Sequence, residues 1–210
     1  MIRVVIADDH PVVRQGLRQI ISATHDIVVA AEARSGRELL AQLESTPSDA
    51  VLLDLSMPGL DGMDVLKILH RDWPHTPVLV LTMHSEDQFA VRALRAGASG
   101  YLTKDSAPGE LVGAIRKITG GGKYISEAVA EKLAAHLGPD AGQPAHERLS
   151  DREYQVLRFI AAGKSTREIA EDLSLSIKTV GTYRSRILEK MGMRTAAELA
   201  AYAVRNRLTD

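Results

Sequence analysis

Short apolar, β-branched runs alternate with helix-length amphipathic stretches through the first 120 residues. The runs predict five strands, at residues 2–7, 27–31, 50–53, 78–81 and 100–102. Helical patterns follow them, at residues 11–23, 35–43, 62–71, 86–96 and 107–119. Three of the runs have almost no polar alternation, as expected for strands that are buried on both faces of a parallel sheet. The pattern therefore predicts a (βα)5 doubly wound parallel sheet with helices on both faces.

A different pattern begins after residue 120. Three consecutive glycines end the fifth predicted helix, and an amphipathic stretch follows at residues 126–137. Residues 138–144 are small, polar and contain proline, which is typical of a linker. Beyond it only helical patterns occur, at residues 151–162, 166–173, 177–191 and 196–206. We expect a first domain at 1–122, an extra helix and flexible linker at 123–147, and a small all-α domain at 148–210.

Side chains suited to capping mark where several of these helices begin. A Ser or Thr followed three residues later by Glu or Gln forms a capping box. This spacing occurs at Ser35 with Glu38, Ser85 with Gln88, Ser150 with Glu153, Ser165 with Glu168 and Thr195 with Glu198. Ser176 is a candidate N-cap for a further helix.

Polar side chains stand where the predicted strands end. The first strand ends in Asp8 and Asp9, the third in Asp54 and the fourth in Thr82, and Lys104 follows the fifth. All strands of a parallel sheet emerge on one edge, where open α/β sheets bind ligands. We therefore expect these side chains to converge on one pocket. The alternative for any single Asp is a solvated loop residue or a helix N-cap.

Three carboxylates in one small site repel each other unless a cation is present. Oxygen ligands suit a hard divalent ion such as Mg²⁺, which takes only one or two carboxylates and keeps several waters. A carboxylate beside Mg²⁺ and a lysine can act as a nucleophile toward a phosphoryl group. The metal and the lysine then neutralise the charge that develops on the phosphoryl oxygens, and a threonine hydroxyl can hydrogen-bond the new group.

Longer motifs surround these residues. They are Asp8-Asp9-His10-Pro11, Leu53-Asp54-Leu55-Ser56-Met57-Pro58-Gly59-Leu60-Asp61-Gly62, Leu81-Thr82, Ala96-Gly97-Ala98-Ser99-Gly100-Tyr101 and Thr103-Lys104-Asp105. As a set they resemble the receiver domain of two-component response regulators, over about residues 1–120. His10 and His84 flank the pocket without the spacing of metal ligands, and we interpret them as loop residues.

The resemblance implies a flavodoxin-like strand order and a role for each matching residue. Asp54 would accept a phosphoryl group from a sensor histidine kinase. Asp9, Asp54 and the backbone carbonyl of Ser56 would ligate Mg²⁺ (or Mn²⁺), and Asp8 would act through water. Lys104 would pair with the phosphoryl group, and Thr82 and Tyr101 would form a switch. The alternative for Tyr101 is plain packing in a short strand.

The two helices at 166–173 and 177–191 are joined by three residues, which is the helix-turn-helix arrangement. One face of the second helix is mostly apolar, with Val180, Tyr183, Ile187 and Met191. The opposite face is small and hydroxyl-rich, with Lys178, Gly181, Thr182, Ser185 and Glu189, and Arg184 and Arg186 flank the two. From the helix pattern alone, a scaffold or dimerisation module remains an equal alternative to a DNA-binding one.

The formal net charge of −1 hides two unlike halves. Residues 147–210 carry 12 Lys and Arg against 9 Asp and Glu, a net charge of +3. Residues 1–146 carry 14 against 18, a net charge of −4. Between residues 164 and 194, seven bases stand against four acids, which is a modest basic patch.

Composition excludes several classes of function. There are no cysteines, so disulfides, cysteine-ligated metals and a cysteine nucleophile are absent. The longest apolar runs, such as residues 78–81, are far shorter than the roughly 20 residues of a membrane span. The N-terminus reaches acidic residues too soon for a signal peptide. We therefore expect a cytoplasmic protein with no membrane partner.

Three motifs of the second domain resemble the LuxR-type helix-turn-helix. They are Leu149-Ser150-Asp151-Arg152-Glu153, Ala162-Gly163-Lys164-Ser165-Thr166-Arg167-Glu168-Ile169-Ala170 and Leu175-Ser176-Ile177-Lys178-Thr179-Val180. The resemblance implies DNA contacts from Lys164, Ser165, Lys178, Thr179, Gly181, Thr182, Arg184, Ser185 and Arg186. Gly181, Tyr183 and Ser185 depart from the pattern of many relatives, so specific base contacts do not carry over.

With both domains, the whole chain resembles a NarL/FixJ-type response regulator. The implied function is a phosphorylation-dependent transcription regulator that binds promoter DNA as a homodimer and turns over no substrate of its own. The last helix would dimerise the domain through Leu199, Tyr202 and Ala203, unless this stripe packs within its own domain. Two alternatives remain, a protein-interaction output and a Mg²⁺-dependent aspartyl-phosphate phosphohydrolase.

Overall fold

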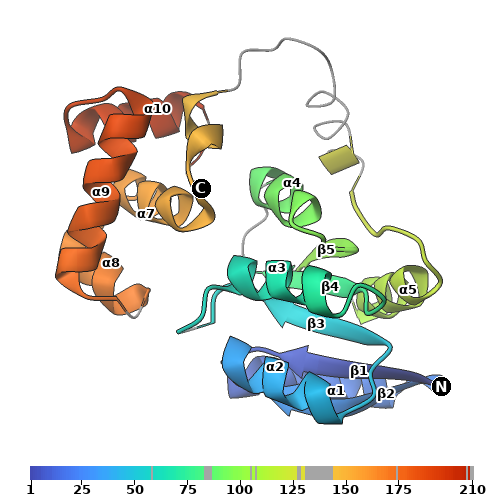
Figure 1. The fold of residues 1–210 in the computed structure, drawn as a ribbon. Coiled ribbons are helices and arrows are strands. Elements are labelled where there is room, and N and C mark those ends of the chain that lie inside the picture. The colour runs from blue at the N-terminus through green and yellow to red at the C-terminus, as the bar shows by residue number, and fades with distance from the viewer. Residues whose placement is uncertain are drawn as a thin grey trace. The chain divides into compact units, whose positions relative to one another are not determined.

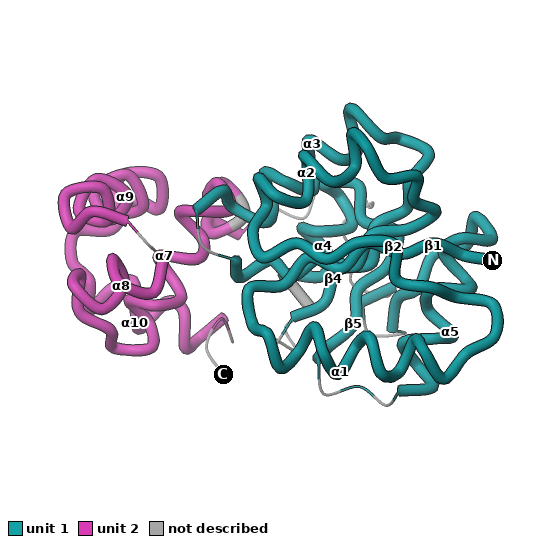
Figure 2. The backbone as a smooth tube through the Cα atoms, turned by 90° about the horizontal axis from the view of Figure 1, so that it is seen from below, with its two compact units in different colours: residues 1–137 teal, residues 138–210 magenta. Residues whose placement is uncertain are grey.

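The chain forms two compact units in a computed structural model, residues 1–137 and residues 138–210 (Figure 2). The structure describes residues 1–57, 59–82, 87–104, 106, 108–126, 129–130, 144–173, 175–206 and 208. Ser85, His84, residues 138–143 of the predicted linker and most of the predicted helix at 126–137 lie outside these residues.

The first unit is a five-stranded sheet with helices between successive strands (Figure 1). The elements are β1 (Ile2–Ala7), α1 (Pro11–Ser22), β2 (Ile27–Ala33), α2 (Gly36–Ser45), β3 (Ala50–Asp54), α3 (Gly62–Asp72), β4 (Val78–Thr82), α4 (Asp87–Arg95), β5 (Gly100–Thr103) and α5 (Pro108–Thr119). The strand order is β2-β1-β3-β4-β5 and every pair is parallel. The predicted (βα)5 sheet of flavodoxin-like order is confirmed.

Alternation along β3 shows why helices cover both faces of the sheet. Ala50 and Leu52 belong to one buried cluster, together with Ile21 of α1 and Ile115 of α5. Val51 and Leu53 point the other way and are equally buried. On that opposite face α2 and α3 lie close together. The absence of a side chain at Gly36 permits this approach, since an added Cβ would collide with Val65.

The chain beyond α5 returns to the sheet. Tyr124 forms a parallel bridge with Gly100. Its N–H donates to the Ser99 carbonyl and its own carbonyl accepts from the Tyr101 N–H, each at 3.0 Å. Lys123 donates to the Ala98 carbonyl at 2.7 Å. The edge of β5 is therefore covered by this short segment, which the hydrophobic pattern did not predict.

The second unit consists of helices. They are η1 (Ala145–Arg148), a 3-10 turn, and α7 (Asp151–Ala161), α8 (Thr166–Asp172), α9 (Ile177–Met191) and α10 (Ala196–Arg205). The core contains Tyr154, Leu157, Ile169, Ile187 and Leu199, all buried. The predicted all-α helix-turn-helix domain is confirmed.

The hydrophobic stripe of α10 faces inward. Leu199 and Ala203 are fully buried, and the Tyr202 hydroxyl lies 2.9 Å from Nδ1 of His146 in η1. Leu199 and Ala203 therefore pack within their own domain, which is the alternative to dimerisation that the sequence left open for this stripe. Ala201 and Val204 of α10 are exposed instead.

Most predicted helix starts are capped as expected. Ser150 and Ser165 form complete capping boxes with Glu153 and Glu168. At Ser35 and Thr195 the hydroxyl accepts the expected N–H, but the partner carboxylate reaches one residue further back, to Arg34 N–H and Arg194 N–H. Ser176 caps α9 by accepting from the Thr179 N–H.

Among the described helices, none combines the length and apolar character needed to cross a membrane.

Candidate functional site

The carboxyl ends of three strands bring one lysine between two carboxylates. Nζ of Lys104 lies 2.7 Å from Oδ2 of Asp54 and 2.7 Å from Oδ2 of Asp8. The side chains of Asp8 and Asp54 are almost completely buried, and the Lys104 side chain is only 6% exposed. Residues about 50 positions apart in sequence therefore meet in one pocket, as the strand-end pattern predicts.

Strand register produces this meeting. Ala7 pairs with Leu53, so the next residue on each strand places Asp8 beside Asp54. Thr82 pairs with Thr103 on the neighbouring strands, and the Lys104 N–H donates to the Thr82 carbonyl at 2.7 Å. A register shift of one residue would turn these side chains to the opposite face of the sheet.

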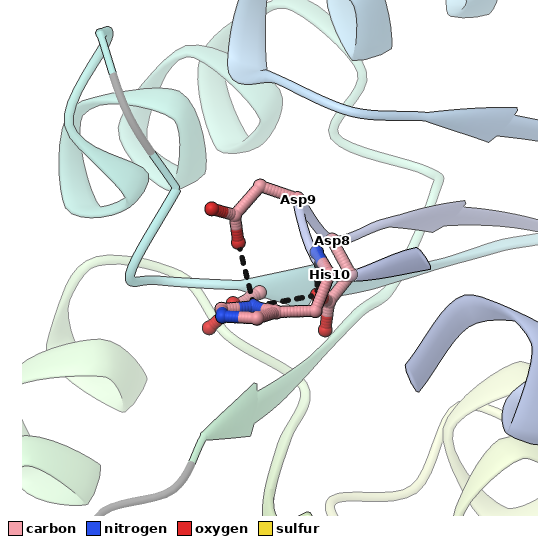
Figure 3. Close-up of side chains that lie close together, drawn as sticks. Asp8, Asp9 and His10 are labelled. Atoms are coloured by element: carbon pink, nitrogen blue, oxygen red, sulfur yellow. Dashed lines mark hydrogen bonds and ion pairs between the residues drawn. The ribbon is translucent and has the colours of Figure 1, made fainter. Parts of the chain in front are cut away.

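Asp9 and His10 lie beside Asp8 (Figure 3), and both side chains are more exposed than that of Asp8. Nδ1 of His10 lies 2.8 Å from Oδ1 of Asp9, and the His10 N–H donates to Oδ1 of Asp8 at 2.8 Å. Ligand atoms of Asp8, Asp9, His10 and Asp54 all lie within 4.8 Å of one another. His10 was expected to be a loop residue, and its place in this cluster was not predicted. Its position directly after the paired acids could have indicated it.

The donor set suits a divalent cation. Three of its four members are carboxylates, the oxygen ligands that hard ions prefer. The buried atom Asp9 Oδ1 accepts no hydrogen bond from the described residues and lies 2.8 Å from Nδ1 of His10, whereas Asp8 Oδ2 already faces Lys104. These residues therefore fit a metal ion, which would satisfy the Asp9 oxygen.

Burial and charge pairing act against each other in this pocket. Burial raises the pKa of the Asp54 carboxyl, and this effect exceeds the opposing influence of the Lys104 ammonium and the Ser56 N–H. Burial alone would lower the pKa of Lys104, but the charges of Asp54 and Asp8 raise it above its usual value. Lys104 therefore stays protonated, and its charge is needed while two buried carboxylates face it.

The loop after Asp54 is shaped by local geometry. The Ser56 N–H donates to Oδ1 of Asp54 at 3.0 Å. Gly62 packs against the backbone of Leu55, where an added Cβ would lie 2.5 Å from Cα. Asp61 caps α3 by accepting from the Met63 N–H at 2.8 Å. These contacts hold Ser56 directly beside the pocket.

The two predicted switch residues lie on the neighbouring strands β4 and β5, where Tyr101 pairs with Val80, two residues before Thr82. Thr82 ends β4 and Tyr101 lies in β5, and both are buried. The backbone N–H of Tyr101 donates to the Tyr124 carbonyl at 3.0 Å, so the predicted switch contacts the segment that follows α5.

The helix-turn-helix presents a polar face on α9. Lys178, Thr182, Arg184, Ser185 and Arg186 are exposed, whereas Gly181 and Thr179 are partly buried. Val180, Ile187 and Met191 are buried on the opposite face, as predicted, and Tyr183 is only partly buried. Thr182 and Ser185 donate their hydroxyls to helix carbonyls of Lys178 and Gly181, which leaves oxygen lone pairs available on the surface.

A hollow of about 330 Å³ brings Lys164, Ser165 and Arg184 together, although they lie on different elements. Nζ of Lys164 is 2.6 Å from Oδ2 of Asp172 and lies over the Phe159 ring. In the described part of this unit the side chains of Lys178, Arg184 and Arg186 have no ion-pair partner. The surface therefore offers three cationic side chains without an ion-pair partner. A fourth, Lys164, would have to leave Asp172 to contact a phosphate.

Two family matches cover most of the chain. Residues 4–116 match the family described as "Response regulator receiver domain". Residues 147–203 match "Bacterial regulatory proteins, luxR family".

Curated relatives and solved structures extend over both domains. The chain is 36% identical to "Response regulator UvrY" of Escherichia coli (strain K12), over 100% of this chain and 97% of the relative. It is 38% identical to "Response regulator GacA" of Pseudomonas viridiflava, over 100% and 99%. A structure of RcsB from Salmonella enterica serovar Typhimurium, bound to promoter rprA with phosphomimetic BeF3-, matches with a TM-score of 0.66 and 30% identity, covering 96% of this chain and 98% of that one. The chain therefore belongs to the NarL/FixJ-type response regulators of two-component systems, which join a receiver domain to a LuxR-type helix-turn-helix domain.

Proposed function

We propose that Asp54 is the phosphoacceptor of this response regulator and that its phosphorylation controls binding of the second unit to promoter DNA. The observation that carries this proposal is the burial of Asp54 at the end of β3 against Lys104, with Asp8 on the other side of the ammonium. Residues 1–122 would receive the signal, 148–210 would deliver it, and 123–147 would join them. The proposed place of action is the cytoplasm, where the chromosome lies.

The proposed chemistry is a transfer of the phosphoryl group from a sensor histidine kinase. An oxygen of the Asp54 carboxylate attacks phosphorus, the phosphorus–nitrogen bond breaks with its electrons leaving on the kinase imidazole, and an acyl phosphate forms. Lys104 exchanges its contact with Asp54 for the new phosphoryl oxygens, a short movement because Nζ already lies 2.7 Å from the acceptor carboxylate. No turnover of an independent substrate is part of the proposal.

The residues that would hold Mg²⁺ (or Mn²⁺) are Asp9, Asp54 and the backbone carbonyl of Ser56, with Asp8 acting through water. When bound, such a cation neutralises charge on the transferring phosphoryl oxygens. Asp8 is suited to an indirect role, since Oδ1 already accepts the His10 N–H and Oδ2 faces Lys104.

The proposed switch uses Thr82 and Tyr101. The Thr82 hydroxyl would be drawn to the phosphoryl group, and the Tyr101 ring would turn inward behind it. Support comes from their burial on adjacent strands and from the hydrogen bond that the Tyr101 N–H donates to the Tyr124 carbonyl.

The proposed DNA surface comprises Lys164, Ser165, Lys178, Thr179, Gly181, Thr182, Arg184, Ser185 and Arg186. Cationic side chains would contact phosphates, and the small face of α9 would approach base edges in the major groove. We propose a homodimer on DNA, which would place two copies of α9 one helical turn apart. The similar protein RcsB is bound to promoter DNA in one structure and is described as dimers bound to DNA in another, which supports a dimer on DNA.

Phosphorylation can be tested with acetyl phosphate and Mg²⁺, followed by a phosphate-affinity gel. The wild-type chain should gain one slower band, whereas Asp54→Asn should gain none. Asp64→Asn is a matched control, because Asp64 is an exposed acid on α3 outside the pocket. Phosphorylation of Asp54→Asn to the wild-type extent would show that the acceptor is another residue.

DNA binding can be tested by fluorescence anisotropy with a mixed-sequence duplex at low and high salt. Binding should strengthen on phosphorylation and weaken as salt rises, because phosphate contacts release counterions. Absence of salt-dependent binding in both states would favour a protein-interaction output instead.

A further inference from the structure

Among the described residues of the first unit, Lys104 and Arg14 have cationic side chains that are almost withdrawn from water. Lys104 belongs to the pocket. Arg14, in α1, takes no part in the proposed chemistry, yet only 9% of its side chain is exposed. Burial of a guanidinium is unfavourable unless partners compensate it, so its partners indicate what it does.

The shortest contact of Arg14 is with the backbone of Asp8. Nη1 donates to the Asp8 carbonyl at 2.6 Å in a buried hydrogen bond. Nε lies 3.4 Å from Oε2 of Glu32 in β2, a looser ion pair. Charge-assisted hydrogen bonds are about twice as strong as neutral ones. The guanidinium is therefore directed mainly at the peptide that carries a pocket carboxylate.

Asp8 is held on both sides of its backbone. Its N–H donates to the Ala33 carbonyl of β2 at 3.1 Å, and its carbonyl accepts from Arg14. Oδ1 accepts the His10 N–H at 2.8 Å, which leaves Oδ2 toward Lys104. These bonds set the direction in which the chain leaves β1, and thereby the direction of the Asp8 and Asp9 side chains.

Packing alone does not require an arginine at this position. Arg14 lies seven residues before Ile21, two helical turns away, so the two share the buried face of α1. An apolar residue would satisfy a position of that kind. Glu32 is the second partner of the Arg14 guanidinium. Its other carboxylate oxygen lies 3.5 Å from Nη1 of Arg18.

We propose that Arg14, held by Glu32, is a positioning residue for the cation and phosphoacceptor pocket. It fixes the Asp8 carbonyl so that the paired acids face the cation. This inference rests on the proposed function. Partners that orient metal ligands typically change metal affinity by roughly 10-fold to 100-fold when removed.

The test is calorimetric titration of the unphosphorylated full-length chain with Mg²⁺. Arg14→Met preserves much of the side-chain volume and removes the donors, and it should raise the Mg²⁺ Kd by roughly 10-fold or more. Arg18→Gln is the matched control, because Arg18 shares Glu32 but is 59% exposed. The Kd of this control should match that of the wild type.

A second readout separates positioning from general stability. With acetyl phosphate as donor, Arg14→Met should need more Mg²⁺ for half-maximal phosphorylation and should approach the wild-type rate at saturating Mg²⁺. A wild-type Kd in folded Arg14→Met overturns the inference, whatever its melting temperature. If Arg14→Met does not fold, Glu32→Gln replaces it, since Glu32 is 32% exposed. Its Kd should rise, and an unchanged Kd overturns the inference.

The wild-type chain distinguishes this inference from the proposed function. A wild type that binds no Mg²⁺ and accepts no phosphate contradicts the proposed function, and with it the role of Arg14. A wild type that does both, beside an Arg14→Met variant with unchanged Mg²⁺ affinity, contradicts only the role of Arg14.

Discussion

At the scale of single residues, the pocket depends on one cation between two buried acids. Lys104 contacts both Asp8 and Asp54 at 2.7 Å, and each side chain is largely shielded from water. Carboxylates this close would repel each other strongly without a positive charge. Lys104 therefore stabilises the unphosphorylated pocket as well as serving the proposed transfer.

Removal of Lys104 should expose this dependence. Lys104→Met should lower the free energy of unfolding of the first unit by about 3 kcal/mol without metal, because a buried charge loses its partner. Mg²⁺ should restore part of the loss, since a ligand that binds the folded state stabilises it. Urea unfolding can be followed by fluorescence of the single tryptophan, Trp73, at the end of α3.

The control for this experiment is Lys67→Met. Lys67 is 53% exposed and lies 3.7 Å from Asp64 on the same helix. Its loss should change stability by less than about 0.5 kcal/mol. Equal losses in the two variants, without rescue by Mg²⁺, would contradict the pairing role of Lys104.

At the scale of elements, the helix starts of the second unit rest on local hydrogen bonds and one partly buried ion pair. Ser150 caps α7, and Glu153 returns a bond to the Ser150 N–H at 2.8 Å. Nζ of Lys190, from α9, lies 2.6 Å from the same carboxylate. The cap of one helix thereby also fixes the position of another.

This arrangement should make α7 sensitive to acid. Burial alone would raise the pKa of Glu153, but bonds from Lys190 and Ser150 outweigh it, so the pKa lies below its usual value. A depressed pKa in the folded state stabilises the fold at neutral pH, and this contribution is lost as pH falls through the folded pKa. Hydrogen exchange in α7 should accelerate as the pH falls below the usual glutamate pKa, after correction for the intrinsic exchange rate. Glu153→Gln should remove most of that pH dependence. If the exchange rates of this variant depend on pH as those of the wild type do, Glu153 is not the group responsible.

The stability of α9 should depend on Gly181. It lies inside α9, and no atom stands within 4 Å of the place a Cβ would take. Gly181→Ala should stabilise α9 by about 0.5–1 kcal/mol, because alanine loses less backbone entropy on folding. Hydrogen exchange of the α9 amides measures this. Gly62→Ala should instead lower the stability of α3, since the added Cβ would lie 2.5 Å from the Leu55 backbone.

At the scale of the whole molecule, the near-zero net charge combines an acidic half with a basic one. The first 146 residues have a net charge of −4 and the remainder a net charge of +3. The acidic excess includes the pocket carboxylates, and the basic excess includes the exposed cations of α9. The sign of the total therefore carries little information about partners.

The charge division should appear in the salt dependence of DNA binding. Arg184→Gln should reduce the slope of log K against log salt by about one for each protein copy on the duplex, if Arg184 contacts a phosphate. Arg71→Gln, at the exposed end of α3, should leave the slope unchanged. Anisotropy titrations at several salt concentrations measure both slopes, and equal slopes in both variants would exclude a phosphate contact by Arg184.

The sequence by itself determined the element order, the caps and the acids at strand ends. These features depend on local periodicity and on hydrogen bonds between residues three or four apart, so they are visible in short stretches of sequence. It also determined that Asp54 and Lys104 would meet, since parallel strands end on one edge. The receiver and helix-turn-helix motifs made the family recognisable.

Only the tertiary structure decided how the rest is arranged. Pairing of Tyr124 with β5, entry of His10 into the acidic cluster, and burial of Leu199 within its own domain all depend on contacts between distant segments. Arg14 is the clearest case. The helical period places it on a buried face, but only the path of β1 beside β2 shows that its guanidinium holds the Asp8 carbonyl. Non-local geometry of this kind is set by packing and register, which no local pattern encodes.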